Sequence, residues 1–288
     1  MFLKDEKSHH LRIDIDYFKK YFAGQIKKNR GKIIKSIKDL IEVESIREEL
    51  FDKVDFGDSY PTDIIIWGKG EPRYPYLTKV GGVPYRPKSQ PWPKMNGKDL
   101  VFFNQWCFID SKDIFKINLP GDVLLTFIDI EEDDFEYFYP DSEKLYFEWQ
   151  NIGIKEIADK SDIKKTNSDI PELFGCLYRS AEYPLNYEKF DDMKEYSNPE
   201  LIPVRQASRI GGDTYYIQST LPEEDETLLC TLSSLLFDYE NDYGFINQQE
   251  KLTRDEAERM ELPFGNAGCF YVFMNENGKI RSDWDYHT

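Results

Sequence analysis

Acidic side chains are the most numerous groups in this sequence that could take part in chemistry. The 288 residues include 54 Asp and Glu against 37 Lys and Arg, a formal net charge of −17. Clustered carboxylates can coordinate Ca²⁺, and a pair of them can hydrolyse a glycosidic bond. Two clusters could contact a basic partner: Glu131, Glu132, Asp133 and Asp134, and Glu223, Glu224 and Asp225. Their spacing does not match the calcium loop, so we predict no metal; the simpler interpretation is solvated loops.

Nucleophilic and cofactor chemistry find little support in the residue types. The three histidines, His9, His10 and His287, lie near the chain ends, so a Ser-His-Asp triad or a Cys-His pair on the body is not expected. Zinc-ligand spacings, Walker loops and dinucleotide fingerprints are absent from the sequence. We therefore name no catalytic residue, expect no cofactor and lean towards a protein that is not an enzyme.

A repeated glycine pair organises the rest of the sequence. The segment 79–85, KVGGVPY, recurs in altered form at 209–215 as RIGGDTY. Each copy is followed by a glutamine, an apolar strand that ends in Asp, and a glycine-led aromatic strand. A repeat of this size predicts two similar units in one body. Because no helix pattern follows, we interpret the pairs as structural turns and not as phosphate cradles.

These motifs resemble those of the YwqG-like family, a bacterial family whose domain has no assigned function. The resemblance covers roughly residues 67–286 and rests largely on glycines and prolines, listed here: Gly81, Gly82, Pro84, Gly121, Gly211, Gly212, Gly265 and Gly268. It implies a fold and little about activity. The family's His falls on Ser208 and its later Asp on Asn266, so any chemistry those groups perform is lost here.

Three side chains are candidates for ligand binding. Trp92 lies between Pro91 and Pro93, where an exposed ring could stack on a ligand or could equally plug the edge of the core. Together with Gln105 and Gln218, it would line a cleft between the two units. The sequence leaves both interpretations of Trp92 open.

Apolar periodicity predicts the elements that position these residues. Residues 13–54 show a helical pattern, and apolar runs near 64–67, 100–109, 123–130, 228–237 and 269–274 predict strands. We predict an α+β fold: a pseudo-duplicated, mostly antiparallel β body with an N-terminal helical extension. The extension covers 1–60 and the YwqG-like domain 61–288, with units at about 61–150 and 205–288 joined by an irregular connector.

Composition limits the function classes. The net charge of −17 argues against nucleic-acid binding, which needs Lys and Arg at the phosphates. No apolar run reaches the length of a membrane span, and no signal peptide is seen. The four cysteines have no close pairing, so we expect buried free thiols in a cytoplasmic protein.

Three functions follow as hypotheses. The first is a non-enzymatic binding protein, of the immunity type, that neutralises a basic protein partner by charge-steered association. The second is a carboxylate-based hydrolase, which requires a pocket with carboxyls of raised pKa. The third is a small-ligand or carbohydrate-binding module that uses the cleft between the units. The oligomeric state does not follow from the sequence.

Overall fold

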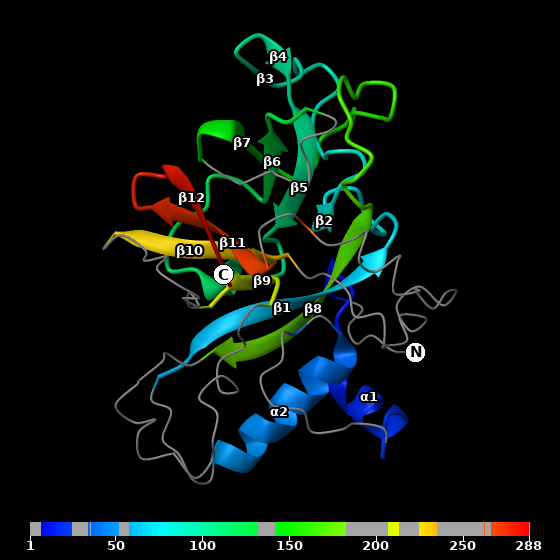
Figure 1. Cartoon of the computed structure of the whole chain (residues 1–288), viewed down its shortest axis with the longest axis vertical. Helices are drawn as coiled ribbons and strands as arrows, with labels where there is room; N and C mark the ends of the chain where they lie inside the picture. Colours follow the sequence, from blue (N-terminus) through cyan, green and yellow to red (C-terminus); the bar gives the residue numbers. More distant parts are fainter. Residues whose placement is uncertain are drawn as a thin grey trace.

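A computed structural model describes most of the chain. The described residues are 7–24, 34, 36–51, 58–131, 142–182, 207–212, 225–234, 262 and 266–287. They form one large antiparallel sheet, with two α-helices against part of it (Figure 1).

The sheet has ten strands in the order β12-β11-β10-β9-β1-β8-β2-β5-β6-β7. Every strand pair in it is antiparallel. The strand bounds are β1 Tyr60–Lys69, β2 Lys79–Val80, β5 Val101–Cys107, β6 Val123–Ile128, β7 Leu145–Gln150, β8 Leu173–Glu182, β9 Arg209–Gly211, β10 Glu226–Ser233, β11 Asn266–Asn275 and β12 Ile280–His287. A separate hairpin joins β3 (Lys94–Met95) to β4 (Lys98–Asp99), and short 3₁₀ turns cover η1 (Lys112–Ile114) and η3 (Ser142–Lys144).

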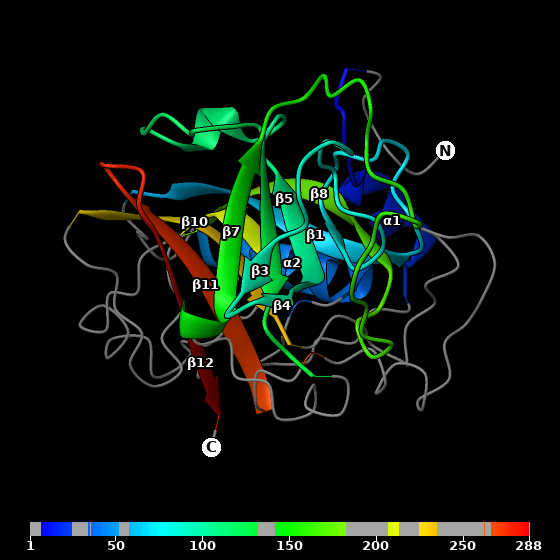
Figure 2. The ribbon, with the colours of Figure 1, turned by 90° about the horizontal axis from the view of Figure 1, so that it is seen from above.

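The sheet curls until its two ends approach each other. β12, at one end of the strand order, contacts η3, which leads into β7 at the other end. The two views agree on this approach (Figures 1 and 2). One apolar core lines the concave face, with side chains from both halves of the sheet, such as Trp106, Leu124, Phe270 and Val272. A continuous curled sheet with a shared interior removes most of the edge that an open sheet would expose.

The helices α1 (Ile15–Tyr21) and α2 (Ile37–Phe51) cover the convex side of β1 and β8 (Figure 1). Asp14 caps α1 by accepting a hydrogen bond from the Tyr17 N–H at 3.2 Å. Phe18 and Leu40 bury their side chains against Ile64 and Ile66 of β1. Neither helix, within the part of the chain that the structure describes, is long and apolar enough to cross a membrane.

The predicted α+β class is wrong, because the described part of the chain is mostly β, with 41% strand against 13% helix. Within the described residues of 13–54, the helical periodicity yields α1 and α2, which pack on one pair of strands. The segment predicted to be an irregular connector also contains β8, which pairs with β1 along its whole length. β8 thus lies inside the sheet, with residues 173–177 buried and Arg179 in its second half exposed.

Candidate functional site

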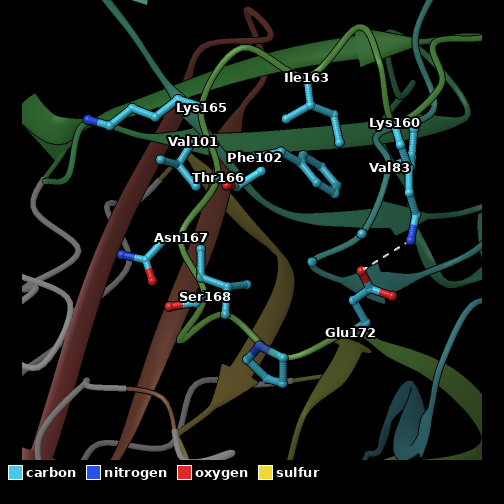
Figure 3. A pocket seen from close by; sticks show the side chains of 14 residues that line it. Val83, Val101, Phe102, Lys160, Ile163, Lys165, Thr166, Asn167, Ser168 and Glu172 are labelled. Carbon is cyan, nitrogen blue, oxygen red and sulfur yellow. Dashed lines mark ion pairs between the residues drawn. The ribbon is translucent and has the colours of Figure 1, made fainter. Parts of the chain in front are cut away.

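A pocket of about 480 Å³ lies beside the first glycine pair (Figure 3). Its walls come from Gly81 and Gly82 after β2, from Val101 and Phe102 at the start of β5, and from the irregular segment 160–172. We name it the mouth pocket. Its volume lies within the range of small-molecule sites in proteins.

The glycine pair allows two chain segments to approach closely at this pocket. Gly81 and Gly82 have φ angles of 63° and 72°, in the left-handed region that glycine adopts without strain. The Gly81 N–H donates to the carbonyl oxygen of Phe103 at 2.8 Å, which fixes the turn against β5. A Cβ atom at Gly81 would lie 2.5 Å from the carbonyl oxygen of Pro171. Only glycine therefore allows this approach of the segment 160–172.

The lining of the mouth pocket is part apolar and part polar. Apolar walls come from Val101, Phe102 and Ile163, and hydroxyl groups come from Thr166 and Ser168. The lysines on its two sides are ion-paired: Lys160 Nζ lies 3.9 Å from Glu172, and Lys165 Nζ lies 3.3 Å from Glu131. The lining therefore offers apolar surface and hydrogen-bonding groups with balanced charge.

The second glycine pair repeats the local arrangement of the first. Gly211 and Gly212 have φ angles of 70° and 84°, in the same left-handed region as Gly81 and Gly82. Before the first pair, buried Lys79 bonds to Glu71 at 2.9 Å; before the second, buried Arg209 bonds to Glu182 at 3.0 Å. In each copy the Glu carboxylate lies against the second glycine. Residues 213–224, which follow the second pair, lie outside the described residues.

Two of the three predicted ligand-binding residues have structural contacts inside the protein. Gln105 is fully buried: its Nε2 donates to the carbonyls of Pro75 and Leu77, and its Oε1 accepts the Tyr85 N–H. Trp92 is 9% exposed, and its Nε1 donates to the Leu100 carbonyl at 2.7 Å. Trp92 also borders a smaller cavity of about 220 Å³. Gln218 lies outside the described residues, so a cleft shared by all three stays a prediction.

The other motif residues have backbone roles where they are described. The Pro84 carbonyl accepts the Arg86 N–H, and a Cβ at Gly121 would lie 2.8 Å from the Gln150 carbonyl oxygen. The Gly268 carbonyl accepts the Ser234 N–H, whereas Gly265 lies outside the described residues. Ser208, at the position of the family's His, is buried and accepts a hydrogen bond from Trp67 Nε1.

The acidic clusters are only partly described. Glu131 is exposed and bonds to Lys98 at 2.6 Å as well as to Lys165. Asp225 is exposed, and the remaining predicted partner contacts, Glu132, Asp133, Asp134, Glu223 and Glu224, lie outside the described residues. The role of these clusters in partner binding stays a prediction.

The structure brings His10 into the body of the protein, which sequence reasoning did not foresee. Its ring is fully buried, with Nδ1 2.7 Å from Asp110 Oδ2 and Nε2 3.0 Å from Thr78 Oγ1. The Thr78 N–H donates to Nε2 at 3.2 Å, so that nitrogen is unprotonated and Nδ1–H donates to the carboxylate. This carboxylate–imidazole–hydroxyl series is closed off from solvent at the ring. It attaches the N-terminal segment to the sheet, and no signal in the sequence links position 10 to position 110.

A second buried ionic contact lies close by. The fully buried carboxylate of Asp63 accepts hydrogen bonds from Arg12 at 2.6 Å, from Arg179 at 2.9 Å and from Ser111 at 2.6 Å. Arg12 and Arg179 also donate to the Asp110 carbonyl. Asp63 therefore joins β1, β8, the N-terminal segment and the loop after β5.

Stability is expected to fall on acidification because of His10. Burial lowers the His10 pKa below 6.5, although the hydrogen bond to Asp110 opposes this. The Asp110 carboxyl is also partly buried, but hydrogen bonds from His10 and His9 outweigh that burial and lower its pKa. The unfolded chain therefore binds the imidazole proton more readily, so stability is present above about pH 6.5 and is lost below it, by up to about 1.4 kcal/mol per pH unit. Urea unfolding of wild type and His10→Gln between neutral and mildly acidic pH measures this slope.

The matched control is His9→Gln, at the neighbouring histidine. We expect a shallower slope in His10→Gln than in wild type, and a wild-type slope in His9→Gln. Equal slopes in wild type and His10→Gln would contradict a neutral buried imidazole.

The described carboxyls with a shifted pKa all shift in one direction. Those with a shifted pKa are all lowered, chiefly through hydrogen bonds to cations or backbone N–H groups: Asp110, Asp113, Asp122, Glu131 and Asp159. A general acid needs the opposite shift. Within the described ranges, no three His, Cys, Asp or Glu side chains gather into a possible metal site.

The four cysteines are buried and free, as the sequence predicted. Burial raises the pKa of Cys107, Cys176 and Cys269 to about 12, so these thiols are protonated and unreactive at neutral pH.

Comparison with protein families gives one match. A family model described as "Domain of unknown function (DUF1963)" matches residues 78–286, from the end of the segment before β2 to β12. No curated protein matches the chain.

Proposed function

We propose that this chain, which belongs to the DUF1963 family of domains of unknown function, is a binding protein that takes a small molecule into the mouth pocket. The observation that carries this proposal is the mouth pocket itself: about 480 Å³, with apolar and hydrogen-bonding walls, built where the first glycine pair meets the segment 160–172. Pockets of this size and mixed lining are the usual sites for small ligands.

The lining favours an uncharged molecule with an apolar body. Both lysines have carboxylate partners, so a charged ligand would have to break an ion pair to find its own partner. Val101, Phe102 and Ile163 offer apolar contacts, while Thr166 and Ser168 offer hydroxyl groups.

The proposal predicts that Thr166→Trp abolishes ligand binding. An indole at this exposed position would fill the mouth pocket and exclude the ligand. The full chain would be incubated with the small-molecule fraction of a cell extract and examined by native mass spectrometry. We expect wild type to retain a compound whose occupancy falls at least about tenfold in Thr166→Trp.

The control is Asn151→Trp, which adds the same indole at an exposed position outside the pocket lining. It should retain the compound as wild type does. Retention by Thr166→Trp equal to that of wild type, or no retention by wild type, would contradict the proposal.

Neutralisation of a basic protein, in the manner of an immunity protein, is a second proposal. Its support is the net charge of −17, which would steer a basic partner to the surface. The pairing of Glu131 with two lysines weakens that contact locally. Pull-down at low and moderate salt tests it: a single basic protein lost as salt rises would support it, and recovery of free protein alone at low salt would contradict it.

We also propose a family identity and a cellular location for this chain. The YwqG-like resemblance and the DUF1963 match cover largely the same residues, so we propose that they are one family. We also propose a cytoplasmic location, because four buried free thiols suit a reducing compartment.

A further inference from the structure

A group of buried polar side chains lies on the concave face of the sheet without partners. Among the described residues, Asn104, 1% exposed, has no hydrogen-bond partner at either Oδ1 or Nδ2, and the Thr126 hydroxyl has none either. The indole N–H groups of Trp106 and Trp149 are also buried and unpartnered. Native proteins rarely leave buried polar groups in this state unless a bound molecule or ordered water satisfies them.

Strand register places these side chains together. Asn104 of β5 is directly opposite Thr126 of β6, and cross-strand partners share one face. Thr126 alternates with Leu125 and Phe127, which lie in the cluster on the convex side, so it points to the concave face. The bulge between Phe102 and Asn104 turns Asn104 to the same face.

The two indoles lie in the next row of that face. Trp106 and Trp149 are the register partners of Leu124 on its two sides, two residues along β6 from Thr126. Leu124 and Trp106 belong to the concave core, and Trp149 packs against it. The four polar side chains therefore occupy two adjacent rows on three neighbouring strands.

The mouth pocket adjoins these rows. Asn104 pairs with Val80, and the next residue along the chain, Gly81, lines the pocket. Val101, also in the pocket lining, shares the concave face with Asn104. The segment 160–172 lines the pocket without helix or strand structure of its own.

We propose that this concave face is the inner part of the ligand site and that the ligand is a planar, uncharged molecule with an amide or lactam group. The Asn104 carboxamide can donate from Nδ2 to the ligand carbonyl while its Oδ1 accepts the ligand N–H, so both free atoms are satisfied at once. The indole N–H groups and the Thr126 hydroxyl supply further donors, and the aromatic side chains supply flat apolar surface. This inference rests on the proposed function, because the ligand enters through the mouth pocket.

Paired probes test the amide specificity. Benzamide and acetophenone have nearly the same shape, but only benzamide carries the N–H that Asn104 Oδ1 would accept. Titration of the full chain, followed by tryptophan fluorescence and calorimetry, is expected to show benzamide binding at least about tenfold tighter than acetophenone. In Asn104→Leu the two probes should bind equally, and Thr126→Val should weaken benzamide without removing its advantage over acetophenone.

The outcomes separate this inference from the proposed function. Three results would overturn the inference and indicate that water satisfies these groups. Wild type could bind both probes equally, Asn104→Leu could leave the ratio of the two affinities unchanged, or neither probe could bind at millimolar concentration. The proposal that the mouth pocket binds a small molecule would still be supported if the compound retained by wild type is lost in Thr166→Trp and retained in Asn104→Leu. Benzamide binding that depends on Asn104 but not on Thr166→Trp would instead support the inner site and overturn entry through the mouth pocket.

Discussion

Gly81→Val is expected to lower the free energy of unfolding by about 4 kcal/mol. Two costs add at this position. Valine at a φ of 63° is strained because its branched Cβ crowds the backbone. Its Cβ would also lie 2.5 Å from a backbone carbonyl oxygen, which a side-chain movement cannot relieve. Urea unfolding followed by circular dichroism measures the loss.

Gly97→Val is the matched control for this prediction. Gly97 has a similar φ of 81°, but nothing lies within 4 Å of the Cβ position. Only the backbone strain applies there, so we expect a loss of about 1–2 kcal/mol. Equal losses in the two variants would show that the approach of Pro171 to Gly81 contributes nothing.

Asp63→Asn is expected to cost about 3 kcal/mol, the second-largest effect. The substitution keeps the shape of the side chain but removes the charge that faces two guanidinium groups. The Asp63 carboxylate is fully buried, whereas Arg12 and Arg179 are 17% and 37% exposed, so water relieves part of the cost at the arginines. The amide also replaces one acceptor oxygen with a donor that faces other donors. Chemical denaturation at neutral pH measures the change.

Asp113→Asn is its control on the same network. Asp113 also bonds to Arg179, at 2.6 Å, but its side chain is 68% exposed. A surface pair contributes less than about 1 kcal/mol because solvent screens it. A loss in Asp113→Asn as large as that in Asp63→Asn would contradict the importance of burial here.

Apolar runs in the sequence predicted several of the strands. The structure explains why β8 was not predicted. β5 and β6 are buried on both faces and show as largely apolar stretches, in which the polar residues are Asn104, Gln105 and Thr126. β8 is equally central, but Gly175 interrupts its apolar run and Arg179 and Glu182 follow. Those charged residues are accommodated by ion pairs to Asp63 and Arg209 from other strands. Local pattern cannot reveal partners so distant in the chain, so the segment resembled a connector.

The sequence predicted the glycine pair at the candidate site but not the polar side chains that line it. The glycine pair was recognised because two adjacent glycines allow the left-handed backbone of a turn, which the sequence shows directly. Thr166 and Ser168 sat in a stretch without periodicity, and their position over Gly81 depends on tertiary structure. Asn104 and Thr126 read as ordinary residues of apolar strands; only the pairing register shows that they face the same interior. The burial of His10 also depends on tertiary structure, so the sequence showed only that His10 lies near one end of the chain.

The attachment of the N-terminal segment has a consequence for the order of events during synthesis on the ribosome. His10 bonds to a residue 100 positions later, and Ile13 donates its N–H to the Leu177 carbonyl. β1 likewise cannot form its pairing with β8 until β8 has been synthesised, since Tyr60 pairs with Glu182. The segment that holds His10 and Ile13 therefore reaches its place later than β5, β6 and β7, which can form a local meander before β8 is made. Contacts of such sequence separation slow folding, and until they form, the apolar side chains of α1 and α2 have no sheet to cover.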